Sequence, residues 1–293
     1  MTREVWLSPS RVQAFDDCRR KYWLSYEVKV SLSSTSSNLV FGSCYDEVFN
    51  TFIRSTVLNG QSFDCGDLFA AKFEAETNAK EVAYNKTMHK DDLMAIGIAM
   101  SRQIPEAWAA TGFTPLFDKD GEPVLQREIV LDLGNSVKYR MKLDLGVVTR
   151  EGEIAIIDNK TSSKSTDPEL LDMLEQVVDY QIGVDAIGPE HDWEPVGKIG
   201  FWEGVKKKAP VITAPVLRDR ASDLEVVDRL RKLQWVAEDI RSGRFPKSPR
   251  AAYNTPCGMC DMRRLCQSLG RDREDYIIGK PYLLDELTQP IAS

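Results

Sequence analysis

Residues 142–161 read KLDLGVVTREGEIAIIDNKT, two runs rich in β-branched and apolar residues on either side of a short polar segment. This pattern predicts a β-hairpin whose turn lies around Glu151. Asp144 and Asp158 are equally far from Glu151 along the chain, so a symmetric hairpin makes them cross-strand neighbours. Because side chains alternate along a strand, Lys160 shares a face with Asp158. We therefore expect two carboxylates and an ammonium group to converge on one spot.

These residue types suit the hydrolysis of a phosphodiester. Two carboxylates bind hard cations such as Mg²⁺ or Mn²⁺, which polarise a phosphoryl oxygen and lower the pKa of a bound water. A lysine beside them orients or deprotonates that water and offsets the charge that builds on phosphorus. A lone Asp-x-Lys on a surface hairpin would carry no such meaning. Here Asp158 and Lys160 close an apolar strand with Asp144 opposite, and this favours the catalytic interpretation of all three.

The composition is that of a globular protein with a substantial core. The chain has 293 residues and a net charge of −7, which argues against a protein that coats nucleic acid through bulk charge but leaves room for a local basic groove. No run approaches the ~20 apolar residues of a membrane span, and the N-terminus shows no secretory signal. We expect a cytoplasmic protein without membrane contact.

The cysteines provide a second signal. Cys257, Cys260 and Cys266 lie close together, and Cys18 stands alone near the N-terminus. Six cysteines in a cytoplasmic chain of this size do not indicate a disulfide framework. Four thiolates from the two chain ends suit either a Zn²⁺ site or a [4Fe–4S] cluster, and the spacing alone leaves both open. The other two cysteines are expected to be small buried apolar side chains.

Periodicity and capping signals predict an α/β protein. A serine cap followed by an early proline predicts a helix from Ser8 that carries Cys18. The region 46–112 has few strand signals and is expected to be a helical insertion. The remaining expected elements are strands at 123–133, 136–148, 153–161, 198–205 and 211–216, and helices at 168–188 and 222–242. The charged tail, residues 271–293, receives no role.

Together these features resemble the PD-(D/E)xK nuclease superfamily. Within it they are similar to the RecB-like iron–sulfur exonucleases, whose relatives include the AddB-type helicase–nucleases and the CRISPR-associated exonucleases. The resemblance runs from Ser8 to Cys266: Asp144 matches the metal-binding aspartate, and Asp158-Asn159-Lys160 matches the (D/E)-x-K motif. It implies a restriction-endonuclease-like core, with a mixed central sheet flanked by helices, in a single domain over residues 1–270.

The order of the cysteines, one before the nuclease core and three after it, also resembles these exonucleases. The resemblance raises a [4Fe–4S] cluster above zinc, with its ligands in segments 8–26 and 254–268. Such a cluster would act as a staple between the chain ends, because joining residues roughly 240 apart removes much chain entropy. The implied ligands are Cys18, Cys257, Cys260 and Cys266.

The sequence departs from the family at one metal ligand. The family places a histidine four residues after a glycine like Gly42, and here that position is Asp46. Aspartate also binds Mg²⁺ or Mn²⁺; alternatively, Asp46 is a helix-surface residue and the ligand is lost. The candidate metal ligands are Asp46, Asp144, Asp158 and Asn159.

The family's Gln-x-x-x-Tyr motif has two possible alignments. Gln176 with Tyr180 keeps both residue types but lies close to Lys160. Gln181 matches the surrounding apolar pattern better but lacks the tyrosine. We prefer Gln181 as the candidate catalytic glutamine, in contact with the DNA backbone or the attacking water.

The resemblance implies an Mg²⁺- or Mn²⁺-dependent DNA exonuclease that acts on single strands or DNA ends in recombination, repair or phage DNA processing. DNA is then the substrate, and a helicase or recombination protein is a candidate partner. The alternative is a non-catalytic DNA-binding or assembly subunit that retains the fold and the cluster. The intact Asp144, Asp158 and Lys160 argue against that alternative, whereas the missing histidine leaves room for it.

Overall fold

The structure, a computed structural model, describes residues 3–171, 173–248 and 256–285. The chain divides into two compact units. The single domain expected over residues 1–270 stays a prediction. We call them the central unit (Thr35–Leu131 and Met141–Arg229) and the terminal unit (Met1–Ser34, Asp132–Arg140 and Leu230–Ser293). The two chain ends thus belong to a unit of their own.

The predicted hairpin is formed by β7 (Val137–Val148) and β8 (Ile154–Ser162). Its register pairs Leu145 with Ile157 and continues to the turn, so every pair is centred on residue 151. Gly152 lies in this turn with a φ of 86°, a left-handed conformation that glycine adopts without steric cost. The predicted symmetric register is confirmed.

A mixed sheet is built around this hairpin. β8 pairs antiparallel with β7 and parallel with β9 (Lys198–Val205), and its first four residues are buried. β9 also pairs antiparallel with β10 (Val211–Ile212) and β11 (Val216–Asp219), which divide the single strand expected at 211–216. β5 (Thr114–Pro115) and β6 (Leu125–Asp132) pair with β7. The mixed central sheet implied by the resemblance is confirmed.

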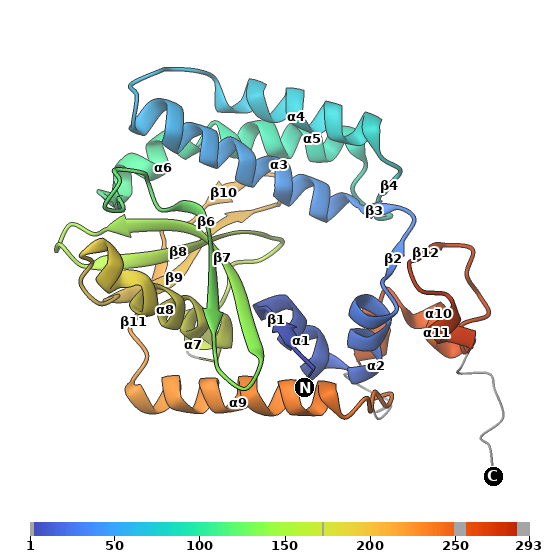
Figure 1. Ribbon diagram of the computed structural model, residues 1–293. Coiled ribbons are helices and arrows are strands. Elements are labelled where there is room, and N and C mark those ends of the chain that lie inside the picture. The colour runs from blue at the N-terminus through green and yellow to red at the C-terminus, as the bar shows by residue number, and fades with distance from the viewer. Residues whose placement is uncertain (1–2, 172, 249–255, 286–293) are drawn as a thin grey trace, which may run out of the picture. The chain divides into compact units, whose positions relative to one another are not determined.

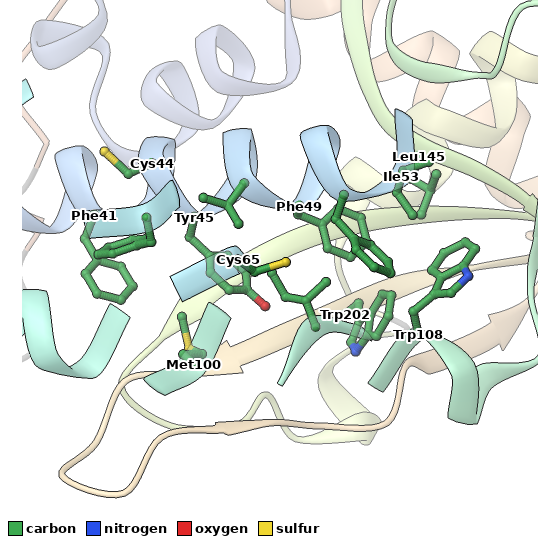
Figure 2. Close-up of a cluster of buried hydrophobic side chains, with 14 of the residues drawn as sticks. Phe41, Cys44, Tyr45, Phe49, Ile53, Cys65, Met100, Trp108, Leu145 and Trp202 are labelled. Carbon is green, nitrogen blue, oxygen red and sulfur yellow. The ribbon is translucent and has the colours of Figure 1, made fainter. Parts of the chain in front are cut away.

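The expected helical insertion lies together on one side of β8 and β9 (Figure 1). Its helices pack an aromatic core against β9, in which Phe49, Trp108 and Trp202 are buried (Figure 2). Gly97 allows two of these helices to approach closely, because a Cβ there would lie 1.9 Å from the Phe69 ring. The elements are β3 (Thr35–Ser36), α3 (Ser37–Phe52), the π-helical η2 (Ile53–Val57), α4 (Cys65–Ala79), β4 (Val82–Ala83), α5 (Lys90–Ser101) and α6 (Ile104–Thr111).

The helix expected at 168–188 is interrupted. Leu174 is extended, with φ −90° and ψ 103°, so α7 (Pro168–Leu171) is separate from α8 (Glu175–Ile187). Figure 1 shows α8 on the side of the sheet opposite the insertion. The short η3 (Gly188–His191) follows α8. Among the helices of residues 3–171, 173–248 and 256–285, none has both the length and the apolar character needed to cross a bilayer.

The terminal unit begins with a strand that the sequence did not predict. β1 (Val5–Leu7) pairs in parallel with the first residues of β7. The predicted helix follows as α1 (Pro9–Asp17), and the Ser8 hydroxyl caps it by accepting from the Arg11 amide at 3.3 Å. The helix ends before Cys18, whose backbone is extended, so the prediction that it carries this cysteine is wrong. The other elements are α2 (Arg19–Tyr22), η1 (Trp23–Glu27), β2 (Val30–Leu32), the last part of α9 (Asp223–Arg241), η4 (Pro256–Met259), α10 (Arg263–Gln267), β12 (Tyr276–Ile278) and α11 (Tyr282–Asp285).

The described part of the C-terminal tail belongs to the terminal unit, although the sequence assigned it no role. β12 pairs antiparallel with β2, with Tyr276 opposite Leu32. Leu284 is fully buried in a cluster that includes Leu265. Residues 286–293 of the tail lie outside the described residues. Backbone pairing and apolar packing therefore already join the N-terminal and C-terminal segments.

Candidate active site

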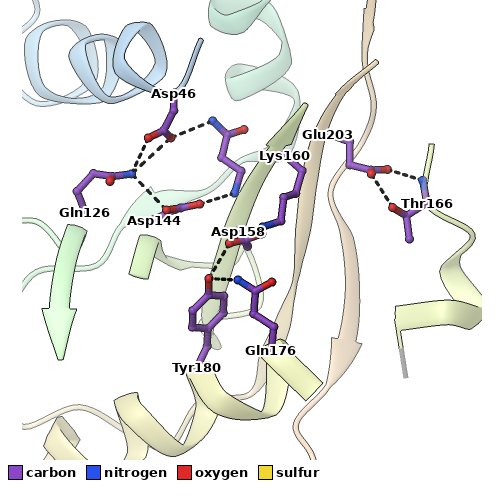
Figure 3. Close-up of polar contacts among 10 residues, drawn as sticks. Asp46, Gln126, Asp144, Asp158, Lys160, Thr166, Gln176, Tyr180 and Glu203 are labelled. Carbon is purple, nitrogen blue, oxygen red and sulfur yellow. Dashed lines mark hydrogen bonds and ion pairs between the residues drawn. The ribbon is translucent and has the colours of Figure 1, made fainter. Parts of the chain in front are cut away.

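Asp158 and Lys160 lie near the end of β8 and share one of its faces, as strand alternation predicts (Figure 3). The Asp158 carboxylate is 2% exposed, and its Oδ2 lies 2.5 Å from Lys160 Nζ. Its Oδ1 accepts a 2.7 Å hydrogen bond from the Tyr180 hydroxyl of α8. Burial, and then the charge of Asp158, raises the pKa of Tyr180, so the phenol remains a donor at neutral pH. An ammonium and a phenol thus fix the orientation of a buried carboxylate.

Asp144 lies on β7, one position beyond the paired residues of the hairpin. Its Oδ2 accepts a 3.0 Å hydrogen bond from the backbone amide of Asn159. Burial raises the pKa of Asp144 to about 8, and the charges of Asp158 and Asp46 add to this effect. Carboxylates that repel one another in a buried place favour the binding of a cation between them.

Asp46 is brought to the same place by α3. Its Oδ1 lies 3.5 Å from Asn159 Nδ2, and burial raises its pKa. Gly42, one turn earlier, lets the helix approach β8, because a Cβ there would already lie 3.3 Å from Thr161 Oγ1. The structure therefore places Asp46 within the site and not on the solvent side of its helix.

Gln126 is a residue of the site that no sequence pattern indicated. Its Nε2 lies 3.1 Å from Asp46 Oδ2 and 3.3 Å from Asp144 Oδ1, so that one amide joins both carboxylates (Figure 3). Gln126 is the second residue of β6 and has a φ of 54°, which is rare for a residue other than glycine. Its place in the site depends on this local backbone conformation, which the sequence does not reveal.

Glu203 is a second unforeseen residue. It is paired with Lys160 in the β8–β9 ladder and is 2% exposed. Its carboxylate accepts hydrogen bonds from the Thr166 amide at 2.7 Å and from the Thr166 hydroxyl at 2.6 Å (Figure 3). The polar loop that follows β8 is therefore fastened beside the lysine.

The structure corrects the choice between the two glutamine alignments. Gln176 Nε2 donates to the Tyr180 hydroxyl at 2.5 Å, so this pair reaches Asp158. Gln181 is fully buried, and both ends of its amide bind the backbone of Ala221, at 3.1 Å and 2.6 Å. Neighbouring residues on a helix point about 100° apart, and Gln181 faces away from the site that Tyr180 enters. Gln181 connects α8 to the segment before α9 and does not take part in the site.

The site opens into a groove of 340 Å³, lined by Asp46, Asp144, Asn159 and Lys160 and by the first turns of α3. In the described part of the chain, no three His, Cys, Asp or Glu side chains converge as a metal ion requires. The carboxylates of Asp46 and Asp144 line the groove, and amide groups of Gln126 and Asn159 connect them by hydrogen bonds. Oδ2 of the buried Asp158 pairs with Lys160 Nζ and keeps a second lone pair that can face a cation. This set of hard oxygen donors fits Mg²⁺ or Mn²⁺.

The four cysteines expected to share one centre all line a single cavity of 270 Å³ in the terminal unit: Cys18, Cys257, Cys260 and Cys266. Burial raises the pKa of Cys260 and of Cys266. Burial acts in the same direction on Cys18, but hydrogen bonds, chiefly from Ser248, bring its pKa below the ordinary value. Residues 254–255 of the expected cluster segment lie outside the described residues.

The other two cysteines are buried in the core of the central unit. Cys44 is 1% exposed and Cys65 is 2% exposed. Burial raises the pKa of each to about 11, so both remain neutral thiols. They are small apolar side chains, as expected.

Comparison with known proteins places this site in a family. Residues 6–267 match the model of the PD-(D/E)XK nuclease superfamily. The crystal structure of a "putative exonuclease" from Eubacterium rectale aligns with a TM-score of 0.51 and 15% identity, covering 88% of this chain and 87% of that one. The structure of SSO0001 aligns with a TM-score of 0.34 and 12% identity, over 75% of this chain and 95% of that one. No curated protein matches the sequence. Because the matched region spans most of the chain, the protein belongs to the PD-(D/E)XK nuclease superfamily.

Proposed function

We propose that this protein is an Mg²⁺- or Mn²⁺-dependent deoxyribonuclease that acts as an exonuclease on single-stranded DNA or DNA ends. The observation that carries the proposal is the meeting of Asp144, Asp158 and Lys160 just beyond the paired part of the β7–β8 hairpin, beside an open groove. Recombination, repair or phage DNA processing is the proposed setting, with a helicase or recombination protein as a partner.

The proposed ligands of the cation are Asp46, Asp144, Asp158 and Asn159. When bound, a divalent cation supplies the charge that polarises a phosphoryl oxygen and lowers the pKa of a water. Lys160 is half-exposed and extends from Asp158 towards the groove. Its ammonium orients the attacking water and offsets the negative charge of the transition state. The backbone amide of Asn159 keeps the Asp144 carboxylate in place for this chemistry.

Tyr180 and Gln176 are positioning residues in this proposal. Tyr180 donates to Asp158 Oδ1 and leaves Oδ2 for the lysine and the cation. Gln176 in turn donates to the Tyr180 oxygen, which fixes the direction of the phenolic hydrogen. The Gln-x-x-x-Tyr pair thus acts through Asp158.

The proposed activity is tested with end-labelled DNA. Protein purified under anaerobic conditions is incubated with single-stranded or double-stranded DNA and Mn²⁺, and the products are resolved by length. Progressive release of short products from labelled ends supports the exonuclease. Products cut at internal positions of closed circular DNA would indicate an endonuclease. Binding of DNA without any cleavage would favour the non-catalytic subunit.

We also propose that the cysteine cavity of the terminal unit holds a [4Fe–4S] cluster. A single zinc ion needs its thiolate ligands about 2.3 Å from one centre. The four thiols instead surround a cavity of 270 Å³. Arg20 adds positive charge near Cys18 and Cys266, which favours thiolates there. A ligand with the bulk of a cluster suits this arrangement better than a single ion.

A further inference from the structure

The amide of Gln126 occupies the place between the carboxylates of Asp46 and Asp144. Its Nε2 lies within 3.4 Å of three of their oxygens, and no other side chain described contacts both acids by hydrogen bonds (Figure 3). The two acids come from different elements, α3 and β7. Gln126 is thus the side chain through which these elements meet inside the site.

The backbone immediately before Gln126 is fixed by burial and by a hydrogen bond. The preceding Val124 and Leu125 are buried, and the Val124 carbonyl accepts a 2.7 Å hydrogen bond from the Gly146 amide of β7. With these neighbours fixed, Gln126, at a φ of 54°, extends its side chain to the carboxylates of Asp46 and Asp144. Unusual backbone conformations of this kind persist where the surrounding structure imposes them, and they cluster at functional sites.

We propose that Gln126 is itself a ligand of the divalent cation, through Oε1. This inference rests on the proposed function, which requires a cation at Asp46 and Asp144. Rotation of the terminal amide exchanges Nε2 for Oε1 without moving the backbone, and the last torsion of glutamine is broad enough to permit it. Without a cation, the carboxylates act only as hydrogen-bond acceptors, and the NH₂ group of Gln126 faces them. The carbonyl oxygen faces the same point once a cation lies there.

The cation site has a use for an additional oxygen ligand that carries no charge. Mg²⁺ and Mn²⁺ take six or more oxygen ligands, so Asp46, Asp144 and Asp158 alone leave positions of the coordination shell open. Mg²⁺ and Mn²⁺ accept neutral amide oxygens as well as carboxylates. Gln126 adds an oxygen without adding another negative charge beside Asp46 and Asp144, which already repel each other.

Direct Mn²⁺ binding to the full chain tests the inference without any measurement of cleavage. Bound Mn²⁺ is determined by calorimetry and by loss of the free-ion electron paramagnetic resonance signal. Gln126→Met keeps the length of the side chain but has no oxygen, and it should weaken Mn²⁺ binding by at least about tenfold. Gln126→Glu restores an oxygen and should bind Mn²⁺ at least as tightly as the unmodified protein.

A histidine at this position provides a spectroscopic signature. Gln126→His should place a ring nitrogen on Mn²⁺, detected as nitrogen modulation in pulsed resonance spectra. The chain has only two histidines, and neither His89 nor His191 lines the groove, so the unmodified protein provides the blank. This readout decides the question even if Gln126→Met does not fold.

Asp144→Ala separates this inference from the proposed function. Loss of Mn²⁺ binding in Asp144→Ala, with unchanged affinity in Gln126→Met and no nitrogen signal in Gln126→His, would overturn the role of Gln126 alone. Unchanged binding in Asp144→Ala would instead overturn the cation site on which both rest.

Discussion

The buried carboxylate of Asp158 is held by one cationic neighbour, Lys160, and one neutral hydrogen-bond donor, Tyr180. Lys160 pairs with Oδ2 and balances the charge, while Tyr180 donates a hydrogen bond to Oδ1. Asp144 lies close enough for its pKa to rise in response to Asp158. Each of these groups has a different task, so removal of any one should produce a distinct loss.

Removal of a central residue should abolish cleavage. Asp144→Ala, Asp158→Asn and Lys160→Ala should each lower the cleavage rate by roughly 10³-fold or more, because they remove a cation ligand or the charge that stabilises the transition state. Circular dichroism and DNA affinity measured without metal should stay close to those of the unmodified protein. An ordinary cleavage rate in any of the three at saturating Mn²⁺ would contradict the proposed roles.

Tyr180 and its neighbour Gln181 should behave in opposite ways. Tyr180→Phe removes the hydrogen bond to Asp158 and should slow cleavage roughly tenfold, the value of one hydrogen bond to a charged group. Gln181→Met leaves the backbone groups of Ala221 without their partners and should lower the free energy of unfolding by about 1–3 kcal/mol. Urea unfolding and cleavage per folded molecule measure the two effects. A larger loss of cleavage in Gln181→Met would restore Gln181 as the catalytic glutamine.

Three of these site residues follow from elementary rules, and two, Gln126 and Tyr180, do not. The symmetry about Glu151 and the alternation along a strand predict that Asp144, Asp158 and Lys160 converge. Gln126 contacts Asp46 and Asp144 from a backbone with positive φ, a conformation that the sequence does not indicate. Tyr180 points to Asp158 and Gln181 does not, because α8 begins as a new helix after the extended Leu174. Apolar periodicity alone does not show where this helix begins.

Among the elements, α3 supplies most of the residues that line the groove. It begins the helical layer, packs on the sheet, and carries Asp46 to the groove. The close approach at Gly42 permits this contact. α3 therefore connects the helical insertion to the hairpin residues that we propose are catalytic. From the sequence, the insertion is expected to be a separate layer.

Substitution of Asp46 tests whether α3 supplies a cation ligand. Asp46→His restores the residue type of the family and should remain active, with a preference for Mn²⁺ over Mg²⁺, because imidazole is a softer ligand than carboxylate. Asp46→Ala should require a much higher metal concentration for the same rate. Metal titrations of the cleavage rate compare the two. An unchanged titration in Asp46→Ala would mean that the helix contributes no ligand.

Elements with strong local signals were predictable, and those that depend on distant partners were not. Ser8 and the proline after it mark the start of α1, and β9 agrees with its expected bounds. β1 has three residues and exists through its pairing with β7, while β12 exists through its pairing with β2. Short strands of this kind carry too little pattern to be read from sequence.

At the scale of the whole molecule, the N- and C-terminal segments form one unit together with residues 132–140, and the two segments 35–131 and 141–229 form the other. The sequence suggested that four cysteines alone would connect the ends. The structure adds the β2–β12 ladder and an apolar cluster that contains Leu24, Leu265 and Leu284. A cluster bound by the cysteines would therefore close a short loop beside an existing connection. Its entropic effect should resemble that of a loop of roughly 15 residues, about 3 kcal/mol, and not that of a loop spanning the chain.

Replacement of the cysteines tests both the nature of this centre and its effect on stability. Anaerobically purified protein should be brown, absorb at about 400 nm and contain roughly four iron atoms per chain. Cys18→Ala, Cys257→Ala, Cys260→Ala and Cys266→Ala should each lose iron and lower the free energy of unfolding by about 3 kcal/mol. Cys44→Ala, in the core of the central unit, is the matched control and should keep its iron.

The outcomes distinguish three cases, because the four thiols and the β2–β12 ladder are independent connections between the same segments. Stoichiometric zinc without iron would replace the cluster by an ion yet leave the connection between the chain ends in place. Iron loss without any loss of stability would mean that the ladder and its apolar cluster hold the ends by themselves. Complete unfolding of Cys18→Ala would mean that the ladder forms only once the metal centre is present, and protection of the β2 and β12 amides from hydrogen exchange would then disappear together with the iron.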